Sequence, residues 1–203
     1  MKILIVSDVH ADADALDKIL VKERSWDIFL FAGDAVGRGK EPNEVVETLK
    51  SLDNVYAVLG NWDYAVITGK VDMARKEEDK ENVEWTRSIL REKNMRWLQM
   101  LPLVKELTVE GKKITIVHGS PDMALYGYIY PWTDKATMRA HLKETDMLVV
   151  GHTHIPVLFE WNTKTWGRRI LINPGSPAFP ASGAKRTYAV LDTNGWKMKI
   201  KTL

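Results

Sequence analysis

The stretch MKILIVSDVHADADALDKILVKERSWDIFLFAGDAV, residues 1–36, decides the fold. Apolar runs at residues 3–6 and 28–32 are short and continuous, which is typical of strands buried on both faces. Between these runs, leucine and isoleucine recur at helical spacing over residues 16–20. A strand, a helix and a second strand in this order predict a parallel βαβ unit.

The same alternation continues for one more unit and is then interrupted. Pro42 opens a second helix and residues 55–59 form a third apolar run, so the repeated βα units predict a parallel sheet. Residues 64–101 are different, because they are dense in charge and repeat apolar side chains at helical spacing up to Pro102. We expect a helical cap or insertion over about residues 64–101, beside the strand ends.

The remainder of the chain reads mainly as strands joined by hairpins. Glu110-Gly111 and Asn194-Gly195 each lie between two apolar runs, and Asn-Gly is the strongest short hairpin signal. The segments expected as strands are residues 103–109, 114–117, 147–150, 156–161, 168–172, 188–192 and 196–200, with a helix around 133–144. A parallel first part and a hairpin-rich second part predict an α/β fold of two mixed sheets packed together, with helices outside.

Composition limits the classes of protein to which this chain can belong. With 203 residues, 45% hydrophobic and 28% charged, it suits one globular domain over residues 1–203. A formal net charge of +2 gives no reason to expect a long nucleic acid as a partner. Because the chain has no cysteine, a metal ion must be held by nitrogen and oxygen. No segment has the length of a signal peptide or a membrane span, so we expect a cytoplasmic protein without membrane contact.

Side chains that can bind metal ions follow five of the expected strands. The set is Asp8, His10, Asp34, Asn61, His118, His152 and His154. Ligands gather at the carboxyl ends of strands in open α/β sheets, and these nitrogen and oxygen donors suffice for two ions that share a carboxylate. Each motif alone also reads as a turn, a helix cap or a buried histidine, but the ordered set favours a metal site.

The ordered motifs resemble a known family. The segments Asp8-x-His10, Gly33-Asp34, Gly60-Asn61, His118-Gly119 and Gly151-His-Thr-His154 are similar to those of the calcineurin-like metallophosphoesterase superfamily. Asn173-Pro-Gly-Ser176 and Tyr188-Ala-Val-Leu-Asp192 resemble its small prokaryotic phosphodiesterase branch. The resemblance covers nearly the whole chain. It implies a four-layer α/β/β/α sandwich with the site at one edge of the sheets, and hydrolysis of a phosphodiester, phosphomonoester or phosphoanhydride.

The resemblance also implies the metal ligands. Asp8, His10, Asp34 and His154 would hold one divalent ion; Asp34, Asn61, His118 and His152 would hold the other, with Asp34 bridging. Two such ions polarise the phosphoryl oxygens and lower the pKa of a bridging water, giving a hydroxide that attacks phosphorus in line. A mixed His, Asp and Asn set suits Mn²⁺, Fe, Ni²⁺ or Zn²⁺. Asp34 and Asn61 are therefore expected to be catalytic.

Two positions depart from the family pattern. Many members have a His after Gly-Asn that serves as the acid to the leaving group, and here Trp62 takes its place. The segment Gly33-Asp-Ala-Val-Gly-Arg-Gly39 resembles a motif of protein serine/threonine phosphatases in which an Asp partners that His, and here Gly37 replaces the Asp. We expect a preference for good leaving groups, unless Asp63 or a metal-bound water supplies the proton. Arg38 remains as a catalytic phosphate contact, although it also reads as a solvated turn residue.

Aromatic side chains mark candidate substrate contacts. Alternate residues in the loop after residue 118 are Tyr126, Tyr128, Tyr130 and Trp132. With Trp62 they could stack a nucleobase, although such a row also suits a core or a homodimer contact. We therefore expect Arg38, Trp62 and Tyr126 to bind a small phosphorylated substrate, with a nucleotide as one candidate. The alternative is a catalytically silent scaffold that binds a protein, like the retromer subunit of this superfamily, but the complete ligand set favours an enzyme.

Overall fold

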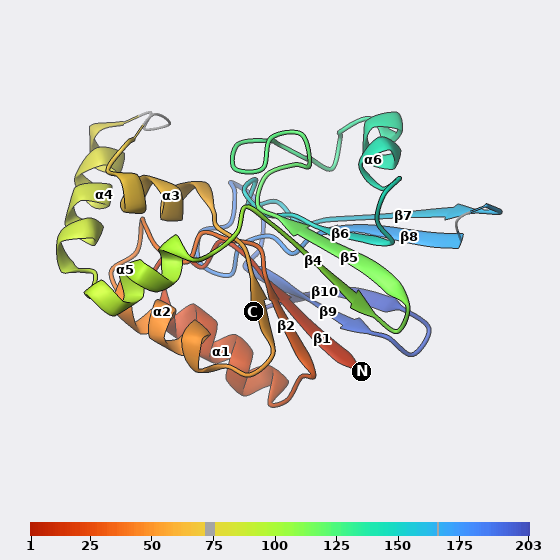
Figure 1. Cartoon of the computed structure of the whole chain (residues 1–203), viewed down its shortest axis with the longest axis horizontal. Coiled ribbons are helices and arrows are strands. Elements are labelled where there is room, and N and C mark those ends of the chain that lie inside the picture. The colour runs from red at the N-terminus through yellow and green to blue at the C-terminus, as the bar shows by residue number, and fades with distance from the viewer. Residues whose placement is uncertain (72–75, 166) are drawn as a thin grey trace.

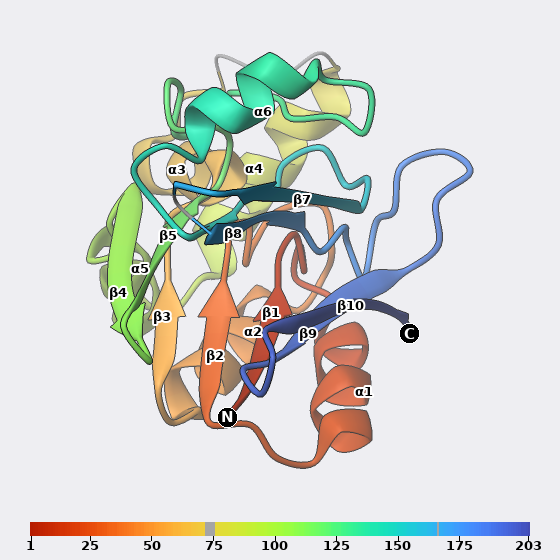
Figure 2. The same ribbon diagram turned by 90° about the vertical axis from the view of Figure 1, so that its right-hand side faces the viewer.

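In the computed structural model, which describes residues 1–71, 76–165 and 167–203, two five-stranded sheets pack face to face. Helices cover the outer face of each sheet, as Figures 1 and 2 show from two directions. The layers therefore follow the order helix, sheet, sheet, helix. The predicted α/β class with two mixed sheets is confirmed.

The first sheet combines parallel strands from the first third of the chain with the final hairpin. Its strand order is β10-β9-β1-β2-β3. β1, β2 and β3 are parallel because helices α1 and α2 cross over between them, whereas β9 is antiparallel to both β1 and β10. The elements are β1 (Lys2–Val6), α1 (Ala13–Glu23), β2 (Ile28–Phe31), α2 (Pro42–Ser51), β3 (Val55–Ala57), β9 (Thr187–Asp192) and β10 (Lys197–Thr202).

The second sheet has the same mixed character. Its strand order is β4-β5-β6-β8-β7. β5, β6 and β8 are parallel, and the hairpin partners β4 and β7 form the two antiparallel edges. The elements are β4 (Val104–Val109), β5 (Lys112–Val117), α6 (Lys135–His141), β6 (Met147–Val149), β7 (Val157–Thr163) and β8 (Gly167–Asn173).

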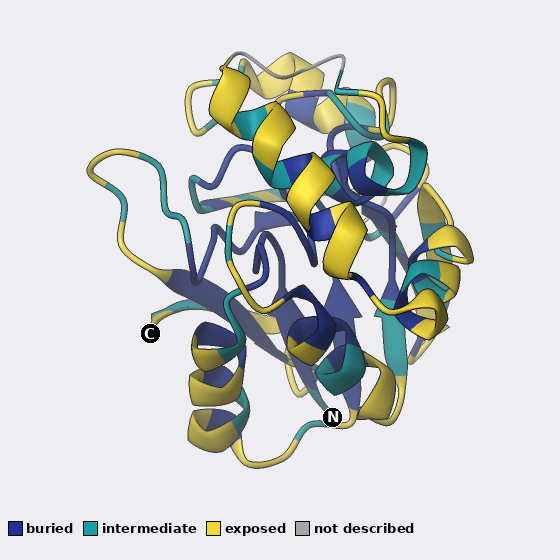
Figure 3. Cartoon of the chain, turned by 90° about the vertical axis from the view of Figure 1, so that its left-hand side faces the viewer, coloured by how far each residue is buried: buried dark blue, intermediate teal, exposed yellow. Residues whose placement is uncertain are grey.

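The apolar runs of the sequence are continuous because both faces of the central strands are covered. Ile3 and Ile5 of β1 face the second sheet, where Ile114 packs in the same cluster. Leu4, on the opposite face of β1, packs with Leu16 of α1. All five side chains are fully buried, and Figure 3 shows buried strands beneath helices whose outer faces are exposed. A strand that contributes to two cores has no polar face, which is why alternation is absent.

Three helices occupy most of the segment expected to be helical: α3 (Asn61–Thr68), α4 (Glu77–Ile89) and α5 (Glu92–Gln99). α3 begins earlier than expected, at Asn61, because the Asp63 carboxylate accepts a hydrogen bond from the Gly60 N–H at 3.0 Å and caps the helix. Residues 72–75 of the expected segment lie outside the described residues. No helix in the described ranges combines the length and apolar character needed to cross a membrane.

The two predicted hairpins are present, but their turns differ. Glu110 and Gly111 form a two-residue turn with φ of 48° and 76°. Asn194-Gly195 instead belongs to a four-residue loop, because the final β9–β10 pair is Asp192 with Lys197. The Asn194 N–H donates to Asp192 Oδ1 at 2.9 Å, and this contact stabilises the wider loop.

Candidate metal centre

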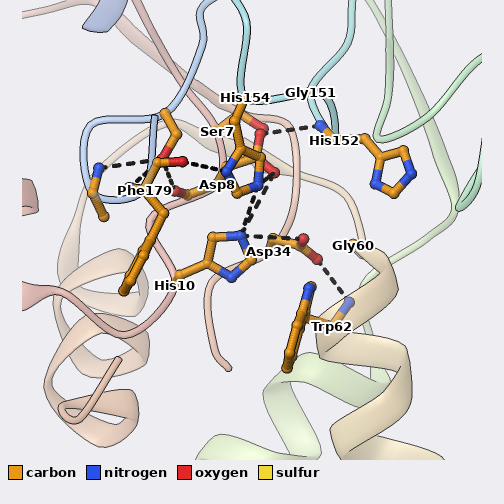
Figure 4. Close-up of polar contacts among 12 residues, drawn as sticks. Ser7, Asp8, His10, Asp34, Gly60, Trp62, Gly151, His152, His154 and Phe179 are labelled. Atoms are coloured by element: carbon orange, nitrogen blue, oxygen red, sulfur yellow. Dashed lines mark hydrogen bonds and ion pairs between the residues drawn. The ribbon is translucent and has the colours of Figure 1, made fainter. Parts of the chain in front are cut away.

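The loops after five strands bring the predicted ligands to one edge of the paired sheets. In chain order these are Asp8 and His10 after β1, Asp34 after β2, Asn61 after β3, His118 after β5, and His152 and His154 after β6. Each of these strands has a parallel neighbour in its own sheet, so the carboxyl ends lie on the same side. Figure 4 shows side chains from both sheets converging there.

Four of these residues form a compact group. Asp8, His10, Asp34 and His154 are buried, and one ligand atom from each lies within 4.8 Å of the others. His154 Nε2 is 3.2 Å from Asp8 Oδ1, and the Nε2 atoms of His10 and His154 are 3.0 Å apart. This is a mixed nitrogen and oxygen donor set of the kind that holds a transition metal.

Asp34 also faces a second pair of donors. Its Oδ2 lies 3.5 Å from His10 Nε2 and 3.4 Å from His118 Nε2. His118 Nε2 is in turn 2.9 Å from Asn61 Oδ1. Asp34 Oδ2 therefore lies between His10 of the compact group and the His118–Asn61 pair.

His152 lies to one side of Asp8, His10, Asp34 and His154, as Figure 4 shows. Its ring centroid is 5.1 Å from that of His118, but it is not a member of the compact group. Its backbone N–H donates to Asp8 Oδ2 at 3.1 Å. The buried Nε2 of His152 has no hydrogen-bond partner among the described residues. Of the four histidines among the predicted ligands, His152 is therefore the one whose Nε2 is buried without a hydrogen bond in the described part of the chain.

Backbone carbonyl groups orient three of the imidazoles. Nδ1–H of His10 donates to Val36 O at 3.3 Å, and Nδ1–H of His118 donates to Ala32 O at 2.7 Å. Nδ1–H of His154 donates to a carbonyl oxygen in the same way, that of Phe179. Each contact places a proton on Nδ1 and directs Nε2 at the carboxylates, so the neutral form of each ring presents an Nε2 lone pair, as metal-bound histidines do.

Each carboxylate has one satisfied and one unsatisfied oxygen. Asp8 Oδ2 accepts the His152 N–H, and Asp34 Oδ1 accepts the Trp62 N–H at 2.8 Å. Within the described part of the chain, the other oxygens, Asp8 Oδ1 and Asp34 Oδ2, are buried without a hydrogen bond. An unpaired buried carboxylate oxygen is costly, so these donors fit a bound cation.

Buried charges act strongly on one another in this site. Burial lowers the pKa of His10 to about 3, despite the attraction of Asp34, so its Nε2 lone pair is available to a metal. Burial also opposes protonation of His118, but the charges of Asp34 and Asp8 outweigh it and raise its pKa to about 9. Burial alone would raise the pKa of Asp8 and Asp34, yet the imidazoles hold both below their usual range. Two ionised carboxylates therefore attract positive charge here.

The backbone of the candidate ligands is strained. Positive φ values occur at Asp8 (57°), His10 (49°), Asp34 (58°), His152 (67°) and His154 (56°). For residues other than glycine this conformation costs on the order of 1–3 kcal/mol each. Such strain persists where the surrounding structure enforces it, and its concentration in these loops is typical of a functional site.

Asp63 supports the site in a way that motif analysis did not assign. Its carboxylate accepts hydrogen bonds from the backbone N–H groups of Asp34 (2.9 Å), Val36 (3.0 Å) and Gly60 (3.0 Å). Burial and the charge of Asp34 raise its pKa to about 7, but the side chain is fully buried and does not line the cavity described below. Asp63 therefore joins two ligand loops, and its role as an acid to the leaving group stays an untested alternative. The signal for this role is its place three residues after Gly60, where a carboxylate caps a helix.

The segment Asn173-Pro-Gly-Ser176 supports the other ligand loops. Ser176 Oγ donates to the carbonyl oxygen of Asp8 at 2.7 Å. Asn173 Nδ2 donates to the carbonyl oxygen of Gly151 at 2.7 Å, directly before the two histidines. This segment therefore orders loops that follow both sheets.

Two glycines allow backbone to approach the carboxylates closely. A Cβ atom on Gly60 would lie 2.1 Å from Asp34 Oδ1. A Cβ atom on Gly151 would lie 2.8 Å from Asp8 Oδ2 and 2.1 Å from Ser7 Oγ. These distances are below van der Waals contact, so these positions require glycine.

A cavity of about 240 Å³ adjoins the ligands. The three predicted substrate contacts, Arg38, Trp62 and Tyr126, line it together with Asp34 and His154. The Arg38 guanidinium carbon lies 5.0 Å from the centroid of the Trp62 ring. The cavity therefore combines a cation, aromatic rings and the candidate metal ligands.

Comparisons with known proteins agree with this geometry. The calcineurin-like phosphoesterase superfamily domain matches residues 1–195. An uncharacterized protein of Methanocaldococcus jannaschii is 31% identical, over 98% of this chain and 85% of its own length. Phosphodiesterase YfcE of Escherichia coli is 26% identical, over 96% of this chain and 89% of its own. The crystal structure of a metallophosphoesterase from Sphaerobacter thermophilus, 28% identical, superposes with a TM-score of 0.81 and covers 100% of this chain and 88% of that one.

The chain therefore belongs to the calcineurin-like phosphoesterase superfamily. This family binds divalent metals, and the buried Asp and His group provides suitable donors. The protein is accordingly a metal-dependent phosphoesterase.

Proposed function

We propose that this protein uses two divalent metal ions to hydrolyse a small phosphoester or phosphoanhydride that has a good leaving group. One ion is held by Asp8, His10, Asp34 and His154, and the other by Asp34, Asn61, His118 and His152. The observation that supports two ions is the position of Asp34 Oδ2, 3.5 Å from His10 Nε2 and 3.4 Å from His118 Nε2. This oxygen has no hydrogen-bond partner among the residues described, so it can bridge two cations.

Each residue has a distinct task in this proposal. Mn²⁺, Fe, Ni²⁺ or Zn²⁺ supplies Lewis acidity, which lowers the pKa of a bound water and polarises the phosphoryl oxygens. The carbonyl contacts of His10, His118 and His154 keep their Nε2 atoms aimed at the centre. Arg38 offers a planar pair of N–H donors to a phosphoryl oxygen in the cavity.

Trp62 supports a preference for good leaving groups. Its indole N–H donates hydrogen bonds but does not titrate near neutral pH, so it cannot replace a histidine as an acid. Asp63 is occupied by three backbone N–H groups. Loss of a positioned acid costs roughly 10²–10⁴-fold for poor leaving groups, which favours aryl esters, anhydrides and substrates with a nucleotide as the leaving group.

Hydrolysis of bis(4-nitrophenyl) phosphate tests this function. Metal-free protein should gain turnover when Mn²⁺ is added, and Asp34→Asn should abolish it. Asp14→Asn is a matched control, because that aspartate lies on α1 with 65% of its side chain exposed, and it should keep full activity. Absence of turnover with all four metals would instead favour the scaffold alternative.

Metal stoichiometry separates two ions from one. Calorimetric titration of the metal-free protein with Mn²⁺ should give two sites, and Asn61→Ala should retain one of them. A single site in the unaltered protein would contradict the bridging role of Asp34. Metal-dependent hydrolysis would then remain, with one ion.

A further inference from the structure

The cavity beside the ligands has aromatic walls that phosphoester hydrolysis alone does not require. Trp62 belongs to α3, whereas Tyr126, Tyr128 and Tyr130 belong to the loop between β5 and α6. These two segments are separate parts of the fold (Figure 1). All four aromatic side chains nevertheless line the same cavity as Asp34 and the histidines.

Trp62 is held firmly in place. Its backbone N–H donates to Asp34 Oδ1, and its ring lies 5.9 Å from that of His10 at an angle of 88°. A Cβ atom on Gly37 would lie 2.5 Å from Trp62 Cε3, so the indole packs directly on the backbone of Gly37. The two departures from the family motif are therefore coupled, because only glycine at position 37 leaves room for this ring. Figure 4 shows Trp62 beside Asp34 and His10.

The tyrosine wall is built from stacked rings. The rings of Tyr128 and Tyr130 are parallel within 2°, with centroids 5.6 Å apart. Tyr128 lies 4.5 Å from the ring of His152, so the row begins at a candidate metal ligand. Gly127, between Tyr126 and Tyr128, packs closely on Ser120, because a Cβ atom at this position would lie 2.0 Å from Ser120 Oγ. Tyr128 keeps 41% of its surface exposed, so a ligand can reach it.

Rigid aromatic surfaces next to a phosphate site favour a particular kind of substrate. A planar ring attached to the phosphate can stack on these side chains, and stacking of one base raises the binding affinity by roughly 5- to 150-fold. An aliphatic group cannot stack in this way. Arg38 lies over the Trp62 ring and adds positive charge at the same place. The walls thus distinguish substrates by the group that the phosphate carries.

We propose that this cavity selects phosphoesters that carry a planar aromatic group, of which a nucleoside is the natural example, and that Trp62 and Tyr128 recognise this group. The proposal rests on the proposed function, since it assigns the substrate class of the same site. Gly37 takes part indirectly, because it makes room for the indole. Trp62 and Tyr128 are then determinants of specificity, and the metal ligands remain responsible for the reaction.

Equilibrium binding tests this specificity without turnover. Adenosine 5′-monophosphate and ribose 5-phosphate share the phosphate and the sugar, and differ only in the base. Calorimetry on the Mn²⁺-loaded protein should show about 10-fold or greater preference for the nucleotide. Trp62→Leu should reduce this ratio to within about 3-fold, and Trp62→Phe should restore most of it, because a ring face returns. Trp85→Leu is the matched control, since Trp85 lies on α4 outside the cavity lining and should leave the ratio unchanged.

The outcomes separate the two proposals. Equal affinities for the two ligands, or a preference unaffected by both Trp62→Leu and Tyr128→Leu, would overturn the specificity, even if bis(4-nitrophenyl) phosphate is hydrolysed. A base-dependent preference that requires either residue supports it, even if no hydrolysis is found. Tyr128→Leu provides an independent test if Trp62→Leu fails to fold, as judged by far-ultraviolet circular dichroism.

Discussion

Glu23, at the end of α1, offers a quantitative test of how a buried charge stabilises this fold. Its side chain is only 3% exposed, and Lys2 Nζ lies 2.7 Å from Oε2. Lys201 Nζ lies 2.8 Å from Oε1, and the hydroxyl of Tyr188 donates to the same oxygen at 2.6 Å. Three donors from β1, β9 and β10 thus attach this helix to the first sheet. Glu23→Gln keeps the shape of the side chain but removes its charge.

The expected cost follows from the pKa of this carboxyl group. Burial opposes ionisation, but Lys2, Lys201 and Tyr188 outweigh it and lower the pKa from 4.5 to about 2. A shift of that size corresponds to about 3 kcal/mol at neutral pH. Both lysines are about one third exposed, so solvent screening reduces the expected cost of Glu23→Gln to about 2–3 kcal/mol.

The sign of the pH dependence is also determined. A carboxyl with a lowered folded-state pKa contributes its full stabilisation above pH 4.5, and this contribution is lost as pH falls toward 2. The difference between the unaltered protein and Glu23→Gln should therefore shrink by about half between pH 7 and pH 3. Urea unfolding, followed by circular dichroism at both pH values, measures this difference in the free energy of unfolding.

A matched control uses a second glutamate with basic partners. Glu47 contacts Arg91 and Lys93, but 34% of its side chain is exposed. Glu47→Gln should therefore lower the free energy of unfolding much less than Glu23→Gln. An equal effect of the two substitutions, or a Glu23→Gln difference that is the same at pH 7 and pH 3, would refute the reasoning.

Three further predictions concern the metal centre. Gly60→Ala places a Cβ atom 2.1 Å from Asp34 Oδ1, so displacement of this carboxylate should lower kcat/KM for an aryl phosphodiester by roughly 10²-fold; unchanged kinetics would mean that the loop relaxes freely. Asp63→Asn puts an amide N–H₂ group against backbone N–H donors. It should lower the free energy of unfolding by about 1–3 kcal/mol, measured by urea unfolding, and weaken Mn²⁺ binding, measured by calorimetry. A loss of stability with no change in Mn²⁺ affinity would limit Asp63 to a folding role. The logarithm of kcat should fall steeply as the pKa of the leaving group rises across a series of aryl esters, because Trp62 cannot supply a proton; a flat plot would reveal another acid.

The strand segments and the convergence of the candidate ligands were predictable because they depend on local patterns. Apolar runs that end abruptly at Asp8, Asp34 or His118 indicate buried strands with polar ends, and parallel strands bring such ends together. The position of the His152 ring was not predictable, because it lies against His118 and Tyr128, which are distant from it in the sequence. The four-residue loop at Asn194 likewise depends on the pairing of its strands rather than on the Asn-Gly pair.

Long-range packing explains two further features that the sequence alone did not reveal. The sequence shows Trp62 and Gly37 as two separate departures from the motif, and only the structure shows that one side chain packs on the other. The role of Asp63 was also hidden in the sequence. Its carboxylate accepts hydrogen bonds from the backbone of two loops, and only the folded structure brings these loops together. The helical cap as a distinct unit and the homodimer depend on contacts beyond local pattern, and both stay predictions.

The candidate centre draws its donors from loops of both sheets, and this has a consequence for biosynthesis. His10 and His154, whose Nε2 atoms are 3.0 Å apart, are separated by 144 residues in the chain. A nascent polypeptide emerging from the ribosome can complete its first three strands long before His154 is made. The candidate donor set is therefore complete only after most of the chain has been synthesised, and an incomplete translation product would present only part of it.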